Sequence, residues 1–372
     1  MIHSVREGDS VMQVQQFEVD RHNLERHRVR TYDASPLDDG EIRVAVDRFA
    51  LTANNITYGV VGEKIGYWQF FPCPDEWGMI PVWGFADVIE SRHDEIDVGE
   101  RLYGYWPMAT HLTMQPGKIA DQRLTDGAAH RANLPPVYNG YARCQREPHY
   151  DPAMDSARML LFPLYATSFC LYDYLVDNDY FDAEQVIIPS ASSKTSIGLA
   201  YALADDPQAK PAVGITSTGN LAKTKALGLY DEVLTYDDIA SVPDQPTVIV
   251  DMSGNGPVLA ALHQHLGDNM KYTSNVGLTH YDENEMVEGF IAARSKMFFA
   301  PGHMQKRAKD WGPGEFEKRA FAFWHSAATR SGDWLSYEYV DGMAAMPDAY
   351  AAVLAGKISP ETGLILSPTD GE

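Results

Sequence analysis

The chain has 372 residues, of which 45% are hydrophobic and 22% are charged, so it is long enough for two globular domains and too apolar for a disordered protein. Its formal net charge of −22 opposes binding to nucleic acid or to an anionic membrane. The three cysteines, Cys73, Cys144 and Cys170, lie far apart, which excludes a disulfide framework and a four-thiolate zinc site. The sequence has neither a run of about 18 apolar residues nor an apolar N-terminal core, so we expect a cytoplasmic protein without a membrane span.

The first part of the chain has the pattern of a β-domain. Polar and apolar side chains alternate in residues 41–46, as in a half-buried strand, and two more short strands are expected at residues 81–89 and 101–105. Residues 97–100 are typical of a tight turn. Short strands separated by Gly and Pro predict a compact barrel or partial barrel. Residues 115–158 have no clear period, which indicates either a surface excursion or a lid.

The pattern changes in the second part. Apolar strands are predicted at residues 185–188, 212–216, 231–235 and 247–251, and helices at residues 197–204 and 221–227. Apolar strands that alternate with helices are typical of βαβ units and of a parallel sheet buried on both faces.

Residues 186–198 carry the main functional signal. A strand leads through a turn into a helix, which is where nucleotide phosphates bind in doubly wound folds, because the helix N-terminus presents unpaired N–H groups. The usual GxGxxG glycines are absent, and hydroxyl groups and one lysine replace them. We expect cofactor contacts from Ser190, Ser192, Ser193, Lys194, Thr195 and Ser196, with Gly198 packing the helix against the strand. The alternative is a serine-rich N-cap with an exposed lysine.

The end of the next strand bears on the choice of cofactor. NAD-binding folds place an Asp or Glu here for the ribose 2′-hydroxyl. This chain has Thr216 and Ser217, followed by Lys223 and Lys225 on the next helix. Hydroxyl donors and a cation suit a 2′-phosphate, so the pattern predicts NADPH rather than NADH. The alternative is an ordinary Ser/Thr/Gly helix cap.

From about residue 36 to 366 the chain resembles the medium-chain dehydrogenase/reductases, especially the quinone and enoyl reductase branch. Residues 53–58 resemble the family's asparagine turn, with Asn54 at the asparagine, and residues 97–103 its "kVGDrV" segment. Residues 161–168 are similar to the helix that enters the cofactor domain, and residues 222–233 to the "lkaLGAdeV" stretch. The Ser-Lys-Thr loop and residues 310–312 resemble a poorly characterised branch of the family.

The resemblance also indicates whether the chain could hold a catalytic zinc ion. In zinc-dependent members three side chains hold the catalytic zinc, and the matching positions here are Asn54, Phe85 and Pro163. None of these side chains ligates zinc as a thiolate or an imidazole does, so the resemblance implies a site without metal. Hydride delivery to an activated C=C bond is then favoured over alcohol oxidation.

Two further groups are candidates for substrate chemistry. The aromatic run 67–71 follows the asparagine turn, where the reductase branch lines its substrate cleft, and the resemblance implies a tyrosine proton donor at Tyr67 or Tyr58. An aromatic core cluster is the alternative. Lys306 and Arg307 are candidates for binding an acidic substrate, although a solvated basic turn is the simpler interpretation.

These patterns predict an α/β protein with a doubly wound parallel sheet in residues 156–300. The resemblance implies that this part is a Rossmann domain and that residues 1–155, completed by residues 301–372, form a GroES-like β-domain. The predicted function is NADPH-dependent, metal-free reduction of an enone, enoyl or quinone-like small molecule, with Tyr67, Tyr58 and Asn54 as catalytic residues. The alternative is a catalytically inactive protein of this fold that binds NADPH or a metabolite as a sensor. A nucleotide hydrolase that uses Lys194 is disfavoured because GxxxxGK[ST] is absent. The sequence does not decide whether the protein forms a homodimer.

Overall fold

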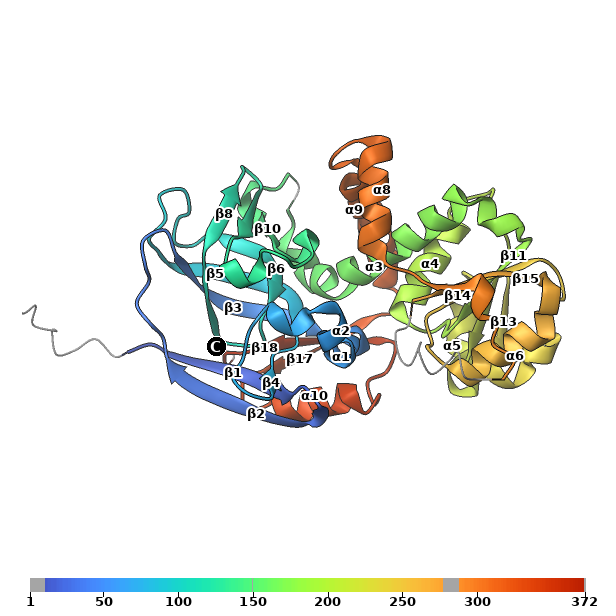
Figure 1. Cartoon of the computed structure of the whole chain (residues 1–372), viewed down its shortest axis with the longest axis horizontal. Helices are drawn as coiled ribbons and strands as arrows, with labels where there is room; N and C mark the ends of the chain where they lie inside the picture. Colours follow the sequence, from blue (N-terminus) through green and yellow to red (C-terminus); the bar gives the residue numbers. More distant parts are fainter. Residues whose placement is uncertain (1–10, 149, 277–287, 371–372) are drawn as a thin grey trace, which may run out of the picture. The chain divides into compact units, whose positions relative to one another are not determined.

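The computed structural model describes residues 11–148, 150–276 and 288–370, and the chain divides into two compact units (Figure 1). Unit 1 comprises Met1–Leu160, Tyr337–Ile358 and Gly363–Glu372, and unit 2 comprises Leu161–Ser336 and Ser359–Thr362. The predicted assignment of residues 301–336 to the β-domain differs from this division, because the two helices in that stretch pack within unit 2.

Unit 1 is built on a mixed sheet with the strand order β17-β18-β3-β5-β6-β10-β9-β8, in which β7 also pairs with β3. The predicted strands are confirmed at β3, β5 and β6, and Gly99, with a φ of 94°, makes the predicted turn before β6. The C-terminal strands β17 and β18 complete the sheet. The strands are β3 (Ile42–Leu51), β5 (Val82–Ser91), β6 (Arg101–Trp106), β7 (His111–Met114), β8 (Pro116–Ile119), β9 (Arg123–Asp126), β10 (Gly140–Arg143), β17 (Ser336–Asp341) and β18 (Thr362–Ser367).

Residues 115–158, which were expected to form a surface excursion or a lid, contribute the strands β8, β9 and β10 to this sheet. Strands β8, β9 and β10 each have four residues and few apolar side chains, so no period can be read from the sequence. Their pairing with one another and with β6 gives them their structure, and Leu124 and Tyr141 are fully buried there.

A second, smaller sheet in unit 1 has the order β2-β1-β4, from β1 (Gln13–Asp20), β2 (Asn23–Asp33) and β4 (Trp77–Gly78). In the described part of unit 1, the helices α1 (Ala53–Val60), α2 (Gly62–Ile65) and α10 (Met346–Leu354) accompany the two sheets. The helix α10 lies beside β2, where the Tyr350 hydroxyl donates to the Leu24 carbonyl at 3.0 Å.

Unit 2 is a six-stranded parallel sheet with the order β13-β12-β11-β14-β15-β16. This is the 3-2-1-4-5-6 order of the Rossmann fold. The strands are β11 (Gln185–Pro189), β12 (Ala212–Thr216), β13 (Glu232–Thr235), β14 (Thr247–Asp251), β15 (Met270–Asn275) and β16 (Ser295–Met297). The structure therefore confirms the predicted doubly wound sheet and the α/β fold class.

Both faces of this sheet are covered by helices (Figure 1). Val186 and Ile188 of β11 pack with one layer, while Ile187 packs with the other, as the period of two in a strand requires. The first layer comes from α3 (Asp155–Asp177) and α4 (Lys194–Ala204), and the second from α6 (Gly256–Leu266). Among the described residues, unit 2 also has the helices α5 (Leu221–Ala226), α8 (Ala300–Trp311) and α9 (Glu315–Ser331).

Helix α3 is longer and more apolar than the sequence pattern indicated. Pro152–Asp177 has the length and composition of a membrane span, which the sequence analysis did not expect, and 56% of its most apolar window is buried inside the structure. Its Asp173 accepts hydrogen bonds from Arg307 of α8. A long core helix of a soluble protein passes the same test, so the helix is weak evidence for a membrane.

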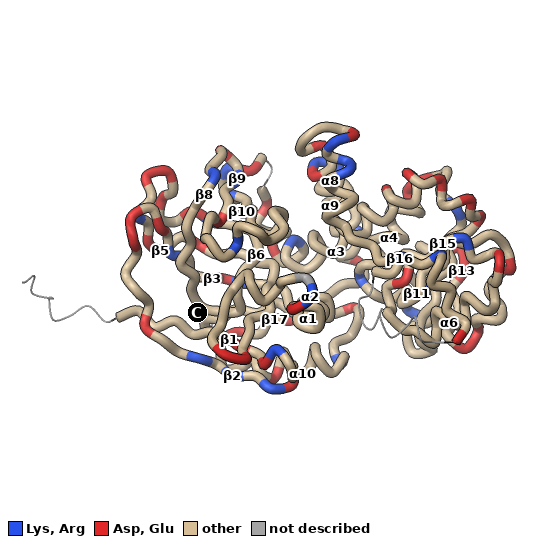
Figure 2. Tube along the Cα trace, in the orientation of Figure 1, with Lys and Arg blue, Asp and Glu red and all other residues tan. Residues whose placement is uncertain are grey.

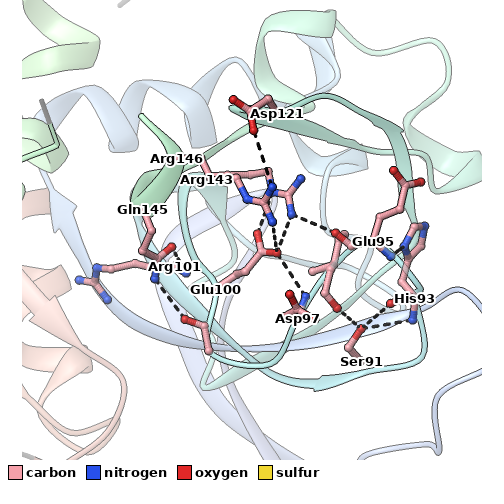
Figure 3. A network of polar contacts seen from close by, with 12 residues as sticks. Ser91, His93, Glu95, Asp97, Glu100, Arg101, Asp121, Arg143, Gln145 and Arg146 are labelled. Carbon is pink, nitrogen blue, oxygen red and sulfur yellow. Dashed lines mark hydrogen bonds and ion pairs between the residues drawn. The ribbon is translucent and has the colours of Figure 1, made fainter. Parts of the chain in front are cut away.

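The loop before β6 is fixed by a buried ion pair (Figure 3). The Glu100 carboxylate accepts hydrogen bonds from Arg143 at 2.7 and 2.5 Å and from the Asp97 backbone N–H at 3.2 Å. Arg143 also donates to the backbone carbonyls of Glu95 and Ala120. Burial alone would raise the pKa of Glu100, but the bonds from Arg143 hold that pKa below its ordinary value.

Replacing Arg143 by Met should lower the free energy of unfolding by about 3 kcal/mol or more, because it removes both close guanidinium hydrogen bonds to a buried carboxylate. Arg146 is the matched control, since it lies 3.6 Å from the same carboxylate but its side chain is 41% exposed. Arg146→Met should therefore cost less than about 1 kcal/mol. Urea unfolding of the two variants makes the comparison, and equal losses would contradict this account of Arg143.

Candidate functional site

The loop between β11 and α4 has the strand–turn–helix geometry that the sequence predicted. Ser190 has a φ of 59°, in the left-handed region that residues other than glycine rarely adopt. The Ser193 Oγ caps α4 by accepting from the Ser196 backbone N–H at 3.3 Å. The backbone N–H groups of Lys194 and Thr195 have no acceptor among the described residues, so the first turn of α4 has donors that an anion can use.

The Ser192 hydroxyl joins this loop to the end of β12. It accepts from the Thr216 hydroxyl at 3.2 Å and from the Asn220 side-chain amide at 3.1 Å. Thr216 is buried, whereas Ser217 is exposed. Thr216 and Ser217 were predicted from the sequence, but Asn220 was not, because an asparagine before a helix is also an ordinary N-cap.

Two tyrosines that the sequence analysis missed hold the same loop from the side of β13. The Tyr230 hydroxyl donates to the Ala191 carbonyl at 2.8 Å, and the Tyr236 hydroxyl accepts from the Ser190 backbone N–H at 3.2 Å. Both tyrosines are distant in sequence from the loop, and no local pattern connects them to it.

Gly198 packs α4 against α3, which corrects the predicted packing against a strand. A Cβ atom at this position would lie 2.4 Å from the Ser168 Oγ and 2.7 Å from the Tyr165 Cδ1. Ser168 also donates to the Thr195 carbonyl at 2.8 Å. Only glycine allows so close an approach of the two helices.

Lys194 is mostly buried and is not the exposed lysine of the simpler interpretation. Its ammonium donates to the backbone carbonyls of Pro360 and Thr362, each at 2.8 Å. Burial lowers the pKa of Lys194 to about 8, so the group is still mainly charged at neutral pH. An ammonium has three N–H donors, and one remains for a phosphate oxygen.

Lys223 also contacts residues 359–362, through an ion pair with the Glu361 carboxylate. The side chains of Lys223 and Glu361 are 54% and 40% exposed, so the pair contributes about 1 kcal/mol at most. Lys225 is exposed on the same helix. The sequence analysis missed Glu361 because its partner lies much earlier in the chain.

Two buried polar residues end β14 and β15 at the same edge of the sheet as this loop. Asp251 accepts from the backbone N–H groups of Ser253 and Gly254, and burial raises the pKa of its carboxyl. The Asn275 side chain is 3% exposed, and its Oδ1 has no donor among the described residues. A buried acceptor without a donor is costly, so Asn275 offers a position where an amide N–H of a ligand would fit.

The tyrosines predicted to be catalytic lie together in unit 1. The rings of Tyr58 and Tyr67 have centroids 4.6 Å apart, and the Tyr58 hydroxyl accepts from the Asn54 side-chain amide at 2.8 Å. The Tyr67 hydroxyl is 3.1 Å from that of Tyr138, which the sequence analysis missed. Burial raises the pKa of Tyr58, Tyr67 and Tyr138, so all three hydroxyls stay protonated at neutral pH.

This cluster is also part of the aromatic core. Tyr58 and Tyr67 are 8% and 6% exposed, and Tyr105 is fully buried with a hydroxyl that has no partner among the described residues. The Tyr105 ring stacks on that of Tyr138 with a centroid distance of 4.8 Å. The two interpretations of the aromatic run, core and proton donor, therefore apply to the same side chains.

The three positions that match zinc ligands lie in different surroundings. Asn54 is on α1, Phe85 is buried in β5 under the Arg101 guanidinium, and Pro163 is inside α3. Over the described parts of the chain, no group of three or more His, Cys, Asp or Glu side chains is arranged to hold a metal ion.

Lys306 and Arg307 were expected in a solvated turn, but they lie on helix α8 and form ion pairs with acids of α3. Figure 2 shows basic and acidic residues close together on α8. Arg307 binds Asp173 and Asp177, and Lys306 binds Asp177 and Asp310. His303 also contacts Asp173, at 2.5 Å. These acids neutralise both bases, which leaves neither as a free clamp for an acidic substrate.

Solved structures share this fold at low sequence identity. CurA from Vibrio vulnificus, solved in complex with NADPH, is 13% identical with a TM-score of 0.59, and the match covers 96% of this chain and 100% of that one. A quinone oxidoreductase from Coxiella burnetii is 12% identical with a TM-score of 0.57, over 96% and 99% of the two chains. The CurK enoyl reductase is 10% identical with a TM-score of 0.55, over 95% and 99%. None of the curated proteins matches the sequence.

These likenesses bear out the fold that the resemblance implied, a GroES-like domain with a Rossmann domain. A family model described as "Protein of unknown function (DUF2855)" matches residues 49–359. The chain belongs to this family and has the medium-chain dehydrogenase/reductase fold.

Proposed function

We propose that the protein is an NADPH-dependent reductase of an activated C=C bond in an enone, enoyl or quinone-like small molecule, and that it acts in the cytoplasm without a metal. The observation that carries the proposal is the parallel sheet of unit 2, whose β11–α4 loop has a helix start with unpaired N–H donors at the carboxyl edge. Doubly wound sheets bind dinucleotides at this edge. The structural neighbours include proteins described as quinone and enoyl reductases.

The residues at this edge suit a dinucleotide. The N–H groups of Lys194 and Thr195, with the hydroxyls of Ser190 and Ser192, would hold the pyrophosphate. Gly198 lets α4 approach α3 closely, which fixes the direction of the helix start. The Asn275 Oδ1, which has no donor among the residues that the structure describes, would accept from the carboxamide of the nicotinamide.

NADPH is proposed over NADH because β12 ends in Thr216 and Ser217 instead of an acid, and because Lys223 and Lys225 follow on α5. A 2′-phosphate carries a charge of about −1.5 to −2, which two nearby ammonium groups favour. A neighbour of this fold, CurA, is described in complex with NADPH.

The proposed reaction adds a hydride to the β-carbon and a proton to the α-carbon of the substrate, and NADPH supplies the hydride when it is bound. The proton would come from the Tyr67 hydroxyl, which stays protonated because burial raises its pKa. The second N–H of the Asn54 amide would stabilise negative charge on the substrate oxygen. Tyr58 holds the Asn54 amide in position.

A second candidate function is that of a sensor that binds NADPH or a metabolite without turnover. It is favoured by the burial of Tyr58 and Tyr67, whose hydroxyls are already hydrogen-bonded within the core. Titration with NADPH, followed by tryptophan fluorescence, and a panel of enones distinguish the two functions. Binding with turnover supports the reductase, whereas binding without turnover supports the sensor.

NADPH should bind at least about tenfold more tightly than NADH, a difference of about 1.4 kcal/mol. Isothermal titration with the two cofactors measures this ratio. Equal affinities, or tighter binding of NADH, would contradict the assignment of Lys223 and Lys225 to the 2′-phosphate.

Tyr67→Phe should lower the rate of substrate reduction by about 10²- to 10⁴-fold, because the variant loses the proton donor while its ring keeps the packing. Binding of NADPH should be retained, since Tyr67 lies outside the unit that carries the cofactor residues. Tyr58→Phe is the parallel variant in the same cluster. If both variants reduce substrate at the parental rate, the proton has another source.

The purified protein should contain no stoichiometric zinc, and its activity should be unchanged by a chelator. The reason is that Asn54, Phe85 and Pro163 replace the zinc ligands of related enzymes. Elemental analysis that finds about one zinc per chain would overturn this assignment.

A further inference from the structure

Residues Ser359–Thr362 lie against the candidate cofactor loop, although most of the C-terminal part of the chain belongs to unit 1. Lys194 donates to the carbonyls of Pro360 and Thr362, and Lys223 pairs with the side chain of Glu361. The Glu361 carbonyl accepts from the Ser336 backbone N–H at 2.9 Å. This four-residue segment is thus held by Lys194 and Lys223, two of the lysines assigned to cofactor phosphates.

These contacts bring the Glu361 carboxylate to the region where the ribose of a dinucleotide is recognised. Lys223 follows Asn220 by three residues, which places the two on one face of the chain as it enters α5. Asn220 and Thr216 both bond to Ser192, so this face borders the carboxyl end of β12. Rossmann folds that bind NADH carry their ribose-binding acid at this strand end.

We propose that Glu361 determines the discrimination between NADPH and NADH, an inference that rests on the proposed function. The end of β12 has no acid, and Glu361, from a distant part of the chain, supplies a carboxylate beside Lys223. A carboxylate accepts a hydrogen bond from the 2′-hydroxyl of NADH but repels a 2′-phosphate and competes with it for Lys223. Glu361 therefore limits the preference for NADPH that Lys223 and Lys225 create.

The exposure of this pair allows such a competition. Both side chains are at least 40% exposed, so a phosphate can reach Lys223 from solvent. An exposed pair is held weakly, and a dianion attracts an ammonium more strongly than a single carboxylate does. The two hydrogen bonds from Lys194 to backbone carbonyls keep residues 360–362 in place when Lys223 leaves Glu361 and binds a phosphate.

The test is isothermal titration of the full chain with NADP⁺ and with NAD⁺, for the wild type, Glu361→Gln and Lys223→Gln. Glu361→Gln should tighten NADP⁺ binding by about three- to tenfold and leave NAD⁺ binding unchanged or weaker, because only the 2′-phosphate is repelled. Lys223→Gln should weaken NADP⁺ binding by about tenfold. The gain from Glu361→Gln should shrink as the salt concentration rises.

Glu315→Gln is the matched control, because it breaks an exposed ion pair with Arg319 on α9 and should change neither affinity. If both cofactors bind but Glu361→Gln keeps the wild-type ratio of affinities within twofold, the role of Glu361 is overturned and the proposed function stands. If neither cofactor binds the wild type, the proposed function fails and the role of Glu361 fails with it. A melting temperature close to that of the wild type shows that each variant is folded.

Discussion

A parallel sheet that is covered on both faces can present polar groups to a ligand at its carboxyl edge, and this constraint organises unit 2. The central residues of β11 and β14 are apolar because both faces of the sheet are buried. Polar residues come where the strands end, at Thr216, Asp251 and Asn275. The candidate cofactor residues follow from this arrangement, since the chain turns into α4 at the same edge.

The parts of the fold that local patterns could predict are those in which a strand or helix is buried along one whole face. The period of two in β3 and the apolar runs of β11, β12 and β14 are strong enough to be read from the sequence. Strands β8 to β10 could not be predicted, because they are short and carry few apolar side chains, so their structure depends on pairing with neighbours. The same limit applies to the loop contacts of Tyr230, Tyr236 and Glu361, which link residues far apart in sequence.

The ion pairs of the protein include buried pairs with a set geometry and exposed pairs whose side chains can change partners. Arg143 with Glu100 and Arg307 with Asp173 are largely buried, so their geometry is set and the loss of either partner is costly. Lys223 with Glu361 is exposed and contributes little to stability. The buried pairs therefore suit the support of a loop or a helix, whereas the exposed pair can change partners when a phosphate arrives.

The tyrosine cluster brings the requirements of packing and chemistry into conflict. A proton donor must reach its acceptor, yet the Tyr67 hydroxyl is buried and is bonded to Tyr138. Tyr138 belongs to the stretch between β9 and β10, which is held by short strands and one-turn helices. A substrate oxygen or carbanion that took the place of the Tyr138 hydroxyl would keep the Tyr67 bond satisfied, and the same side chain could then serve the core in one state and the reaction in the other.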